Sequence, residues 1–581
     1  MTTAEGPGHA RRPPALAFGF WTGPRRRVAW ALAFALVMLT LAQVAIPIAL
    51  NVWSQRLFDA IEQRDVPQLL RQVGVAALIV VASLSVMTAH LAVRRRLQID
   101  WRSELTDRLL REWVADGRYD QLSRMPGPHD NPDGRIAEDI RIATEFTVDL
   151  AHSLLYCVLL LVSFTQILWV LSGPPEIGIG DWTLYLPGHL VWIAFLYAGA
   201  GAGIATLLGR PLVRAANRRQ DKEADFRVGL VRVRERALTI ALRSAEAAER
   251  RHLARLFDGL VGAWRAQTRA LAHLFMFSSS WSVMTQAVPV LVAAPRYMAG
   301  AITLGVLMQT AQAFQQVIAA LAWPIDNMQK LAECRASIAR VSHLHESLLQ
   351  LRATRGRADH EAIVVTTGDE GSLDIDDLSL STPDGNCLVQ HFSASIGAGE
   401  RVVLQADPPV ALNLFRAVAG LWPWGSGSIR LPRGAAVHFV PRRPRHGVAT
   451  LREALLHVSP TTDRPPPPAA PDVELSAALR AVGLAHLSSR LDESANWSER
   501  LSGPDRQRLA IAQVLVLKPA WIFMREATSE LGPDEAARLL RLIGTTLPGS
   551  TIVATGRDCA VSLSPHRLID LSTRSDPDVP G

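Results

Sequence analysis

Residues 28–50 read VAWALAFALVMLTLAQVAIPIAL and contain no Asp, Glu, Lys or Arg. A helix of about 20 apolar residues crosses the hydrocarbon core of a bilayer, which is about 30 Å thick. A helix that is apolar on all sides belongs either in a membrane or in the centre of a large core. This stretch predicts a membrane-spanning helix, and it leaves residues 1–27 as an N-terminal segment.

Five further segments without Asp, Glu, Lys or Arg follow along the chain, at 73–93, 151–172, 189–209, 271–295 and 298–323. A soluble protein would have to bury six such helices in succession, whereas each of them is long enough to cross a bilayer. The pattern therefore predicts an α-helical transmembrane domain with six spans over residues 28–351.

Basic residues flank these spans unevenly. Five arginines precede the first span, and residues 94–150 and 210–270 hold ten and fifteen Lys or Arg residues. The intervening loops hold four arginines: Arg56, Arg64, Arg71 and Arg296. Because Lys and Arg near span ends stay on the cytoplasmic side, both termini are expected in the cytoplasm. We expect a multi-pass protein of the plasma (inner) membrane, with the lipid bilayer as one partner.

The two inward connections are long and carry many charges at helical spacing, over residues 102–125 and 219–257. They are expected to continue the spans as helical arms in the cytoplasm. An amphipathic helix is expected over 326–351, and the polar residues 352–371 are expected to form a linker.

Beyond the linker the pattern changes. Short apolar runs at 373–381, 400–405 and 520–524 alternate with helical segments, which is typical of an α/β domain. We place this domain at residues 372–572, and we expect residues 573–581 to be a flexible tail.

Composition excludes several classes of protein and site. With 49% hydrophobic residues, the chain is neither disordered nor a nucleic-acid-binding arm, so no nucleic acid partner is expected. Although Lys and Arg number 61 against 54 Asp and Glu, only Lys222, Lys330 and Lys518 are lysines. The four cysteines lie far apart without a CxxC pair, so we expect neither a disulfide framework nor a metal site.

Two segments of the second half carry motifs. Residues 501–508 read LSGPDRQR, and residues 521–529 read WIFMREATS. They resemble the signature motif and the Walker B strand of an ABC nucleotide-binding domain, and GLWP at 420–423 with GSG at 425–427 supports the resemblance.

Three segments of the membrane half resemble the SbmA/BacA-like branch of ABC transporters. They are DNPDGRI at 130–136, ILWVLSG at 167–173 and EADFR at 223–227. This branch comprises bacterial peptide and vitamin B12 importers and is related to the peroxisomal fatty-acyl ABC transporters. The resemblance covers residues 20–572, nearly the whole chain.

This resemblance implies a half-transporter: a six-helix transmembrane domain of the exporter type, followed by an α/β nucleotide-binding domain like a P-loop NTPase. Two halves dimerise, and ATP is held between the Walker A loop of one half and the signature motif of the other. The family's coupling helices, which contact the nucleotide-binding domains, are expected near residues 126–134 and in the second inward loop.

The loop aligned with Walker A has lost its diagnostic residues. Walker A uses glycines to expose backbone N–H groups to the phosphates, a Lys for the β- and γ-phosphates, and a Ser or Thr for magnesium. The aligned loop is QADPPVAL at 405–412, where Pro408 and Pro409 have no N–H to donate. Ala411 and Leu412 stand at the lysine and hydroxyl positions.

Other elements of the same nucleotide site are altered as well. Arg525 stands where Walker B has its magnesium-binding Asp, Arg442 replaces the Q-loop glutamine, and Arg557 replaces the switch histidine. Gly532 replaces the D-loop aspartate. Glu526 matches the catalytic base by position only, and we expect it to be a vestige or an acceptor for a neighbouring arginine. Whether the chain is an ATPase stays open at this point.

The signature segment is better preserved. Ser502 and the backbone at Gly503, at a helix N-terminus, are expected to contact the ATP of a partner, together with Gln507. Pro504 replaces a glycine and removes one donor. ATP–Mg is therefore expected only at a composite site with an intact partner. A heterodimer is favoured over a homodimer.

Two alternatives stay open beside this dead half of a heterodimer. The first is an ATP-independent, proton-driven carrier, which needs ionisable groups at membrane depth. The spans offer four histidines for this role: His90, His152, His189 and His273. Asp59 and Glu62, in an outward loop, are reserve carboxylates. A non-transporting scaffold or regulator is the other, but the membrane half shows no comparable loss of motifs. Neither the substrate, whether peptide, vitamin or lipid-like, nor the direction of transport follows from the sequence.

Overall fold

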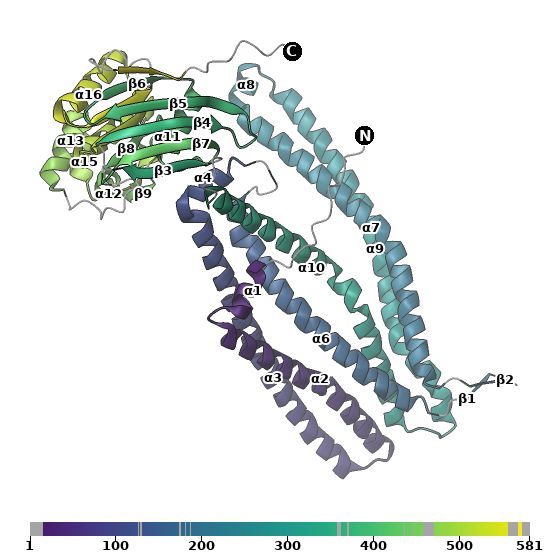
Figure 1. The fold of residues 1–581 in the computed structure, drawn as a ribbon. Coiled ribbons are helices and arrows are strands. Elements are labelled where there is room, and N and C mark those ends of the chain that lie inside the picture. Colours follow the sequence, from purple (N-terminus) through teal and green to yellow (C-terminus); the bar gives the residue numbers. More distant parts are fainter. Residues whose placement is uncertain are drawn as a thin grey trace, which may run out of the picture. The chain divides into compact units, whose positions relative to one another are not determined.

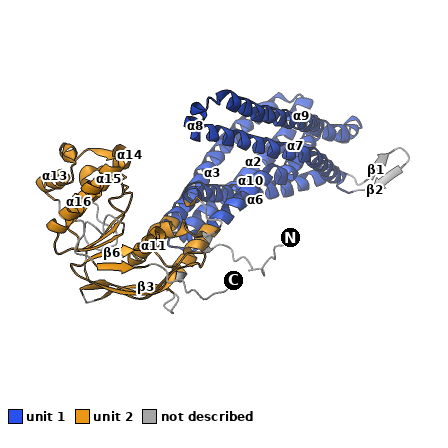
Figure 2. Ribbon diagram, turned by 90° about the horizontal axis from the view of Figure 1, so that it is seen from above, with its two compact units in different colours: residues 1–107, 133–342 blue, residues 108–132, 343–581 orange. Residues whose placement is uncertain are grey.

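The computed structural model describes residues 15–571 except 126, 128–130, 174–175, 180–181, 186, 357–361, 369–370, 435, 446, 457–469 and 556–566. Arg557 and the predicted tail at 573–581 lie outside the described residues. The chain divides into two compact units (Figure 2). The membrane unit comprises residues 1–107 and 133–342, and the α/β unit comprises residues 108–132 and 343–581.

Long helices make up the membrane unit (Figure 1). In chain order the helical elements are α1 (Ala15–Thr22), α2 (Arg26–Glu62), α3 (Val66–Val114), α5 (Pro132–Gly134), the π-helical turn η2 (Arg135–Asp139), α6 (Ile140–Leu171), α7 (His189–Glu235), α8 (Ala237–Leu242), α9 (Glu246–Met298) and α10 (Leu304–Gly356). The antiparallel strands β1 (Glu176–Ile179) and β2 (Trp182–Tyr185) lie between α6 and α7. The last residues of α3 and α10 belong to the α/β unit.

Within the described residues, five helical segments are long and apolar enough to cross a membrane: Arg26–Glu62, Val66–Leu122, Pro132–Leu171, His189–Glu235 and Glu246–Met298. The sixth span, expected over 298–323, begins in a turn and continues into α10, which does not reach the same hydropathy. Its glutamines Gln309, Gln312, Gln315 and Gln316 lower the mean hydropathy of this helix. The sixth span therefore stays a prediction.

A buried apolar cluster joins α6, α7 and α10. Its members are Leu160, Phe164, Leu168, Leu190, Val191, Ala194, Ala313, Phe314, Val317 and Ala320. Elsewhere the spans expose large apolar side chains, among them Leu78 on α3 and Leu196 on α7. Contiguous apolar surface is a liability in water, and lipid contact accounts for it here.

An ion pair and a hydroxyl hydrogen bond, both to Asp139, fix η2 against α10. The Asp139 carboxylate accepts a hydrogen bond from Ser337 Oγ at 2.9 Å and from Arg340 Nε at 2.8 Å. Burial alone would raise the pKa of Asp139, but these hydrogen bonds and the Arg340 charge outweigh it and hold the pKa below its usual range. The contact ties the start of α6 to the C-terminal half of α10.

Two larger sheets organise the described part of the α/β unit (Figure 1), and β9 and β10 form a small antiparallel pair. The parallel sheet has the order β13-β6-β12-β11-β8, and the second large sheet has the order β3-β7-β4-β5. The strands are β3 (Ile363–Gly368), β4 (Ser372–Ser381), β5 (Cys387–Gly397), β6 (Arg401–Gln405), β7 (Gly425–Pro432), β8 (Val437–Val440), β9 (Val448–Thr450), β10 (Ser494–Asn496), β11 (Trp521–Arg525), β12 (Thr551–Thr555) and β13 (Arg567–Asp570).

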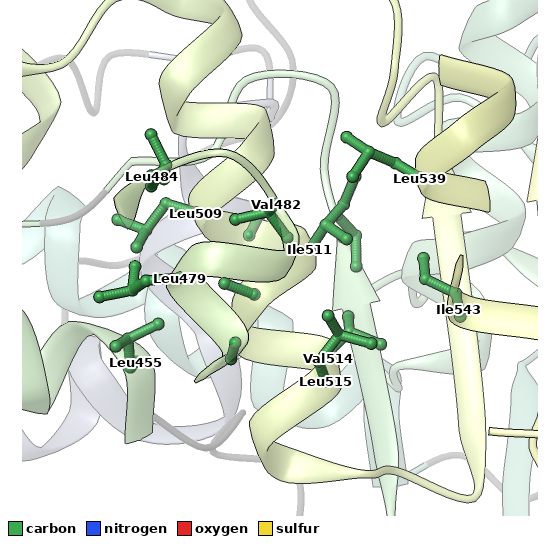
Figure 3. Close-up of a cluster of buried hydrophobic side chains, with 14 of the residues drawn as sticks. Leu455, Leu479, Val482, Leu484, Leu509, Ile511, Val514, Leu515, Leu539 and Ile543 are labelled. Atoms are coloured by element: carbon green, nitrogen blue, oxygen red, sulfur yellow. The ribbon is translucent and has the colours of Figure 1, made fainter. Parts of the chain in front are cut away.

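Helices cover the parallel sheet and build a second core (Figure 3). The helical elements of the α/β unit are η1 (Ala115–Gly117), α4 (Arg118–Leu122), α11 (Pro408–Val418), α12 (Leu451–Leu456), α13 (Asp472–Ala481), η3 (Ala485–Arg490), α14 (Trp497–Arg500), α15 (Gly503–Leu517) and α16 (Pro533–Thr546). Leu455, Leu479, Leu509, Val514 and Leu539 come together from α12, α13, α15 and α16. This core packs α15 against the neighbouring helices and against Ile522 and Met524 of β11.

The expected linker at 352–371 includes ordered structure. α10 continues to Gly356, and β3 occupies residues 363–368. β3 pairs in parallel with β7, from Ile363 opposite Gly427 to Gly368 opposite Pro432. Because the run IVVTTG alternates between more and less exposed positions on the edge of the sheet, its polar residues do not prevent it from forming a strand. The α/β fold therefore begins earlier than residue 372.

Candidate functional site

The turn that follows β6 is short and closed by proline. β6 ends at Gln405 and α11 begins at Pro408, so that only Ala406 and Asp407 join the strand to the helix. Asp407 is extended, with φ −62° and ψ 141°, and Pro408 and Pro409 begin the helix. Proline suits a helix start, but it leaves these positions without an N–H. A phosphate-binding loop needs several such donors, and Asp407 adds a negative charge.

The position of the phosphate-binding lysine faces the interior. Ala411 is 1% exposed, and its neighbours Val410 and Leu414 belong to the apolar cluster beneath α11. The small apolar side chain fits this place, where a lysine would carry its charge toward the core. Leu412 stands at the position of the magnesium-binding hydroxyl. The described geometry therefore offers neither of these two groups to a nucleotide.

Arginines gather where the family binds magnesium. Arg525 ends β11 opposite Thr555 of β12, and its Nε is buried without a hydrogen-bond partner among the described residues. Burial lowers the pKa of Arg416 on α11, and the charges of Arg124 and Arg525 lower it further against the attraction of Asp120. This positive field opposes the binding of a divalent cation.

Glu526, the positional match for the catalytic base, faces an arginine. Its Oε2 lies 3.3 Å from NH1 of Arg442, which stands at the position expected for the Q-loop glutamine. Glu526 has a left-handed backbone, with φ 46°, and its N–H donates to Thr555 O at 3.1 Å. Glu526 is thus the ion-pair acceptor of a neighbouring arginine, Arg442. The catalytic role of Glu526 itself stays a prediction.

Gln507 is not on the surface. Its side chain is fully buried, and its Nε2 donates to Arg442 O at 2.8 Å and Ser529 Oγ at 3.3 Å. Its Oε1 accepts from Glu530 N at 3.0 Å. The amide therefore fixes the segments around Arg442 and Glu530 inside the α/β unit, and this placement does not favour the predicted contact with a partner's ATP.

Ser502 and Gly503 begin α15, as the sequence predicts for the signature segment. Ser502 is the N-cap: its Oγ accepts from Asp505 N at 3.3 Å and donates to Asp505 Oδ2 at 2.7 Å. A Cβ at Gly503 would overlap Glu530 Oε2, so the Glu530 carboxylate lies directly against this glycine. Glu530 Oε1 in turn lies 3.5 Å from Arg443 Nε.

Two carboxylates thus already occupy the positive end of α15. Such charges stabilise a helix N-terminus, and they compete with any phosphate for the same dipole. The sequence pattern does not point to Glu530 and Arg443, because their contacts join segments far apart in the chain. A signal for Asp505 was present, since Ser502-x-x-Asp505 is close to a capping-box pattern.

The segment that docks on α11 lies before the expected one. In α4, Gln121 Nε2 donates to Leu421 O at 3.1 Å, and Asp120 Oδ2 lies 3.6 Å from Arg416 Nε. Burial raises the pKa of Asp120, but hydrogen bonding and charge from Arg124 and the charge of Arg416 together hold it below its usual range. The contact is therefore an ionised one.

A coupling helix was expected near 126–134, and the contact with α11 that the described residues show comes from 118–122. Asp116 and Gly117 have left-handed backbones, with φ 55° and 70°, which turn the chain after α3 and start α4. Residues 132–139 instead lead into α6 in the membrane unit, and 126 and 128–130 lie outside the described residues.

Known proteins share this architecture of a helical membrane unit and an α/β unit. A profile described as ABC transporter transmembrane region 2 matches residues 21–298. Inner membrane ABC transporter ATP-binding protein YddA of Escherichia coli K12 is 29% identical over 540 residues, 92% of both chains. An uncharacterized ABC transporter ATP-binding protein of Synechocystis, sll0182, is 30% identical over 548 residues, 92% of this chain and 78% of the relative. The chain belongs to the ABC transporter family.

This ABC transporter subunit also has the fold of a solved exporter. The structure of a bacterial Atm1-family ABC exporter with ATP bound superposes with a TM-score of 0.62, covering 94% of both chains at 17% identity. The exporter-type fold, a helical membrane domain followed by an α/β domain in one chain, is therefore confirmed. The chain is a multi-pass membrane subunit of a transporter.

Proposed function

We propose that this chain is the ATPase-deficient half of a dimeric ABC transporter. The observation that carries the proposal is the turn between β6 and α11, where Ala406 and Asp407 alone precede Pro408 and Pro409. A two-residue turn followed by two prolines, which have no N–H groups, cannot surround a phosphate with backbone donors. The arginines at positions 442 and 525 add positive charge where magnesium and the attacking water are handled in the family.

The test uses the purified full-length chain with magnesium and an azido-ATP photolabel. We expect no saturable labelling and no ATP hydrolysis by the chain alone. Vanadate-sensitive hydrolysis by the chain alone that Glu526→Gln abolishes would overturn the proposal. The matched control is Glu535→Gln, which changes a carboxylate paired with Arg508 outside this site.

An intact half-transporter is the partner that fits this chain. Such a partner would bring its own Walker A loop, and Ser502 and Gly503 would close on its ATP. For this contact the Glu530 carboxylate has to leave Gly503, because a carboxylate and a γ-phosphate repel each other. ATP–Mg is then bound only at the composite site, and the heterodimer is favoured over a homodimer.

Co-expression with an intact half tests the partner. We expect the pair to copurify and to hydrolyse ATP in a vanadate-sensitive manner, and we expect Ser502→Arg to abolish the hydrolysis. Thr546→Arg, at an exposed position near the end of α16, is the control. A stable homodimer that transports without any partner would contradict this part of the proposal.

The remaining features of the proposal are its branch, its topology and its cargo. We place the chain in the SbmA/BacA-like branch. We propose that it crosses a bacterial inner membrane with six spans and has both termini in the cytoplasm. The thirty basic residues on the predicted cytoplasmic side support this orientation. The cargo class is a peptide, a vitamin or a lipid-like molecule.

A second candidate is an ATP-independent carrier, which one contact in the membrane unit favours. His90 Nε2 lies 3.2 Å from His152 Nδ1, and Thr40 Oγ1 lies 3.0 Å from the same Nδ1. Because Thr40 donates its own hydroxyl proton to Leu36 O at 2.7 Å, His152 Nδ1 is the donor in this group. If His90 Nε2 were protonated as well, its N–H would face the N–H of His152 Nδ1 at this distance.

Uptake measurements separate the two candidates. If the histidine pair drives a proton-coupled carrier, uptake of a labelled peptide or of vitamin B12 persists after ATP depletion and stops with an uncoupler. His152→Gln would then stop it too, whereas His343→Gln, an exposed residue of α10, would not. Uptake that follows ATP and survives His152→Gln leaves the heterodimer proposal as the better one.

A further inference from the structure

An open groove of about 560 Å³ lies between α3 and α6 in the membrane unit. Arg95, Arg96 and Arg102 line it from α3, together with Gln98 and Asp100, and Glu145 lines it from α6. Gln98 is buried at its base, where its Nε2 donates to Glu145 O at 3.1 Å and joins the two helices. The groove is therefore a feature of packed helices.

The acidic groups around the groove already have arginine partners. Asp100 lies 3.8 Å from Arg96, and Glu145 lies 3.4 Å from Arg141. One turn further along α6, Asp149 Oδ1 lies 3.6 Å from an Arg94 nitrogen and accepts a hydrogen bond from the Gln98 amide. In each pair the arginine neutralises the carboxylate. The net positive charge of the groove therefore comes from the other two arginines that line it, Arg95 and Arg102.

Two arginines of the groove contact neutral acceptors. Arg95 NH1 donates to Gln98 Oε1 at 3.2 Å, and Arg102 NH2 donates to Ala137 O at 3.3 Å. A guanidinium has five N–H donors, so each of these contacts uses only part of the group. The two residues are seven positions apart, which places them on the same side of α3 about 10 Å from each other along its axis.

The level of the groove relative to the bilayer follows from two independent observations. The charge-free stretch of α3 ends at residue 93, directly before these arginines. On the next turns, Trp101 contacts Trp21 at 5.8 Å between ring centroids, and Trp21 contacts Trp30 at 5.4 Å. Aromatic clusters of this kind sit among lipid headgroups. The groove thus opens at the height of the headgroups.

We propose that Arg95 and Arg102 bind the phosphate of an anionic phospholipid headgroup in this groove. Guanidinium groups match phosphate oxygens with parallel hydrogen bonds, and a basic pocket beside a span attracts anionic lipid. Phosphate is the chemistry that is recognised, and a lipid is favoured over a soluble phosphate because the groove opens at the headgroup level. The inference needs only the membrane placement of α3 and is independent of the chain's ATP site.

The test measures lipid retention by native mass spectrometry on the full-length chain in detergent. Phosphatidylglycerol is compared with phosphatidylcholine for wild type and for the double variant Arg95→Gln, Arg102→Gln. We expect wild type to prefer phosphatidylglycerol and the double variant to lose about tenfold or more of that preference. Arg214→Gln with Arg218→Gln is the matched control, since it removes two exposed arginines just beyond another span.

Further arms keep the outcome clear. The double variant Arg95→Lys, Arg102→Lys keeps the charge but not the paired N–H groups, so it is expected to retain more of the preference than the Gln variant and less than wild type. A Tm of the Gln variant equal to that of wild type shows that its loss of preference is not misfolding. Inorganic phosphate at millimolar concentration is expected not to displace the lipid. Displacement by inorganic phosphate would overturn the lipid in favour of a soluble ligand, and an unchanged preference in the Gln double variant would overturn the site itself.

Discussion

The substitution Gln507→Ala distinguishes a structural role of this residue from a role in binding a partner's ATP. The fully buried amide of Gln507 donates to Arg442 O and Ser529 Oγ and accepts from Glu530 N. Alanine would leave the Arg442 carbonyl and the Glu530 N–H without these partners. Ser529 is exposed and its hydroxyl can turn to water.

The expected cost follows from these two backbone groups. A fully buried polar group that loses its hydrogen bond costs about 1–3 kcal/mol. Because Arg442 is an exposed residue and Glu530 is half-buried, the two groups together are expected to cost the α/β unit about 2–4 kcal/mol of unfolding free energy. For a unit of this size, that corresponds to a fall in Tm of roughly 5–12 °C. A residue whose amide acted only on a partner's nucleotide would leave Tm unchanged in the isolated chain.

The assay is thermal unfolding of the full-length chain in detergent, followed by tryptophan fluorescence. Trp497 reports on the α/β unit, because it is fully buried and its Nε1 donates to Ala449 O at 3.0 Å. Gln405→Ala, the same change at an exposed residue, is the control and is expected to stay within about 0.5 kcal/mol. An unchanged Tm for Gln507→Ala, together with lost ATPase activity of the heterodimer, would refute the structural assignment.

Three further predictions concern titration and charge. Burial lowers the pKa of His438 to about 4, so that, as the pH falls, the unfolded chain binds a proton at this imidazole before the folded chain does. The α/β unit therefore loses up to about 3 kcal/mol of unfolding free energy as the pH falls from roughly 6.5 to 4. His438→Gln is expected to flatten the dependence of Tm on pH in that window. Asp139→Asn should cost about 1–3 kcal/mol at pH 7, and the difference from wild type should vanish as acid protonates Asp139 below its usual pKa, which paired unfolding curves would check. Glu530→Gln removes the carboxylate beside Gly503 and is expected to lower the KM for ATP of the heterodimer, whereas an unchanged or higher KM would show that Glu530 does not obstruct the phosphate.

Much of the fold follows from local patterns in the sequence. Charge-free stretches predict long helices, and the apolar run before Glu526 predicts β11 because such patterns depend on neighbouring residues alone. The loop predicted at 405–412 turns out to include the first residues of α11, because Pro408 and Pro409 favour a loop in the sequence and also suit the first turn of a helix. The position of α4 was missed because it depends on the left-handed conformations of Asp116 and Gly117.

Contacts between segments that are distant in the chain could not be predicted from the sequence. His90 and His152 were both candidates near span ends, but only the packing of α3 against α6 brings their ring nitrogens together. Likewise, the sequence places Gln507 in a motif that faces ATP in relatives, while the structure turns its amide inward. A motif identifies which residues are aligned, and the three-dimensional contacts decide what each side chain can reach.

The pattern of loss and retention in the α/β unit supports a working subunit over a remnant. α11 begins at the altered nucleotide loop, and its later residue Arg416 lies 3.6 Å from Asp120 of α4, while Leu421 beyond the helix accepts from Gln121. A remnant under random drift would not be expected to hold this half-buried polar contact a few residues from a loop that lacks the Walker A residues. A working half that docks α4 on α11, while a partner supplies the nucleotide chemistry as we propose, would be expected to hold it.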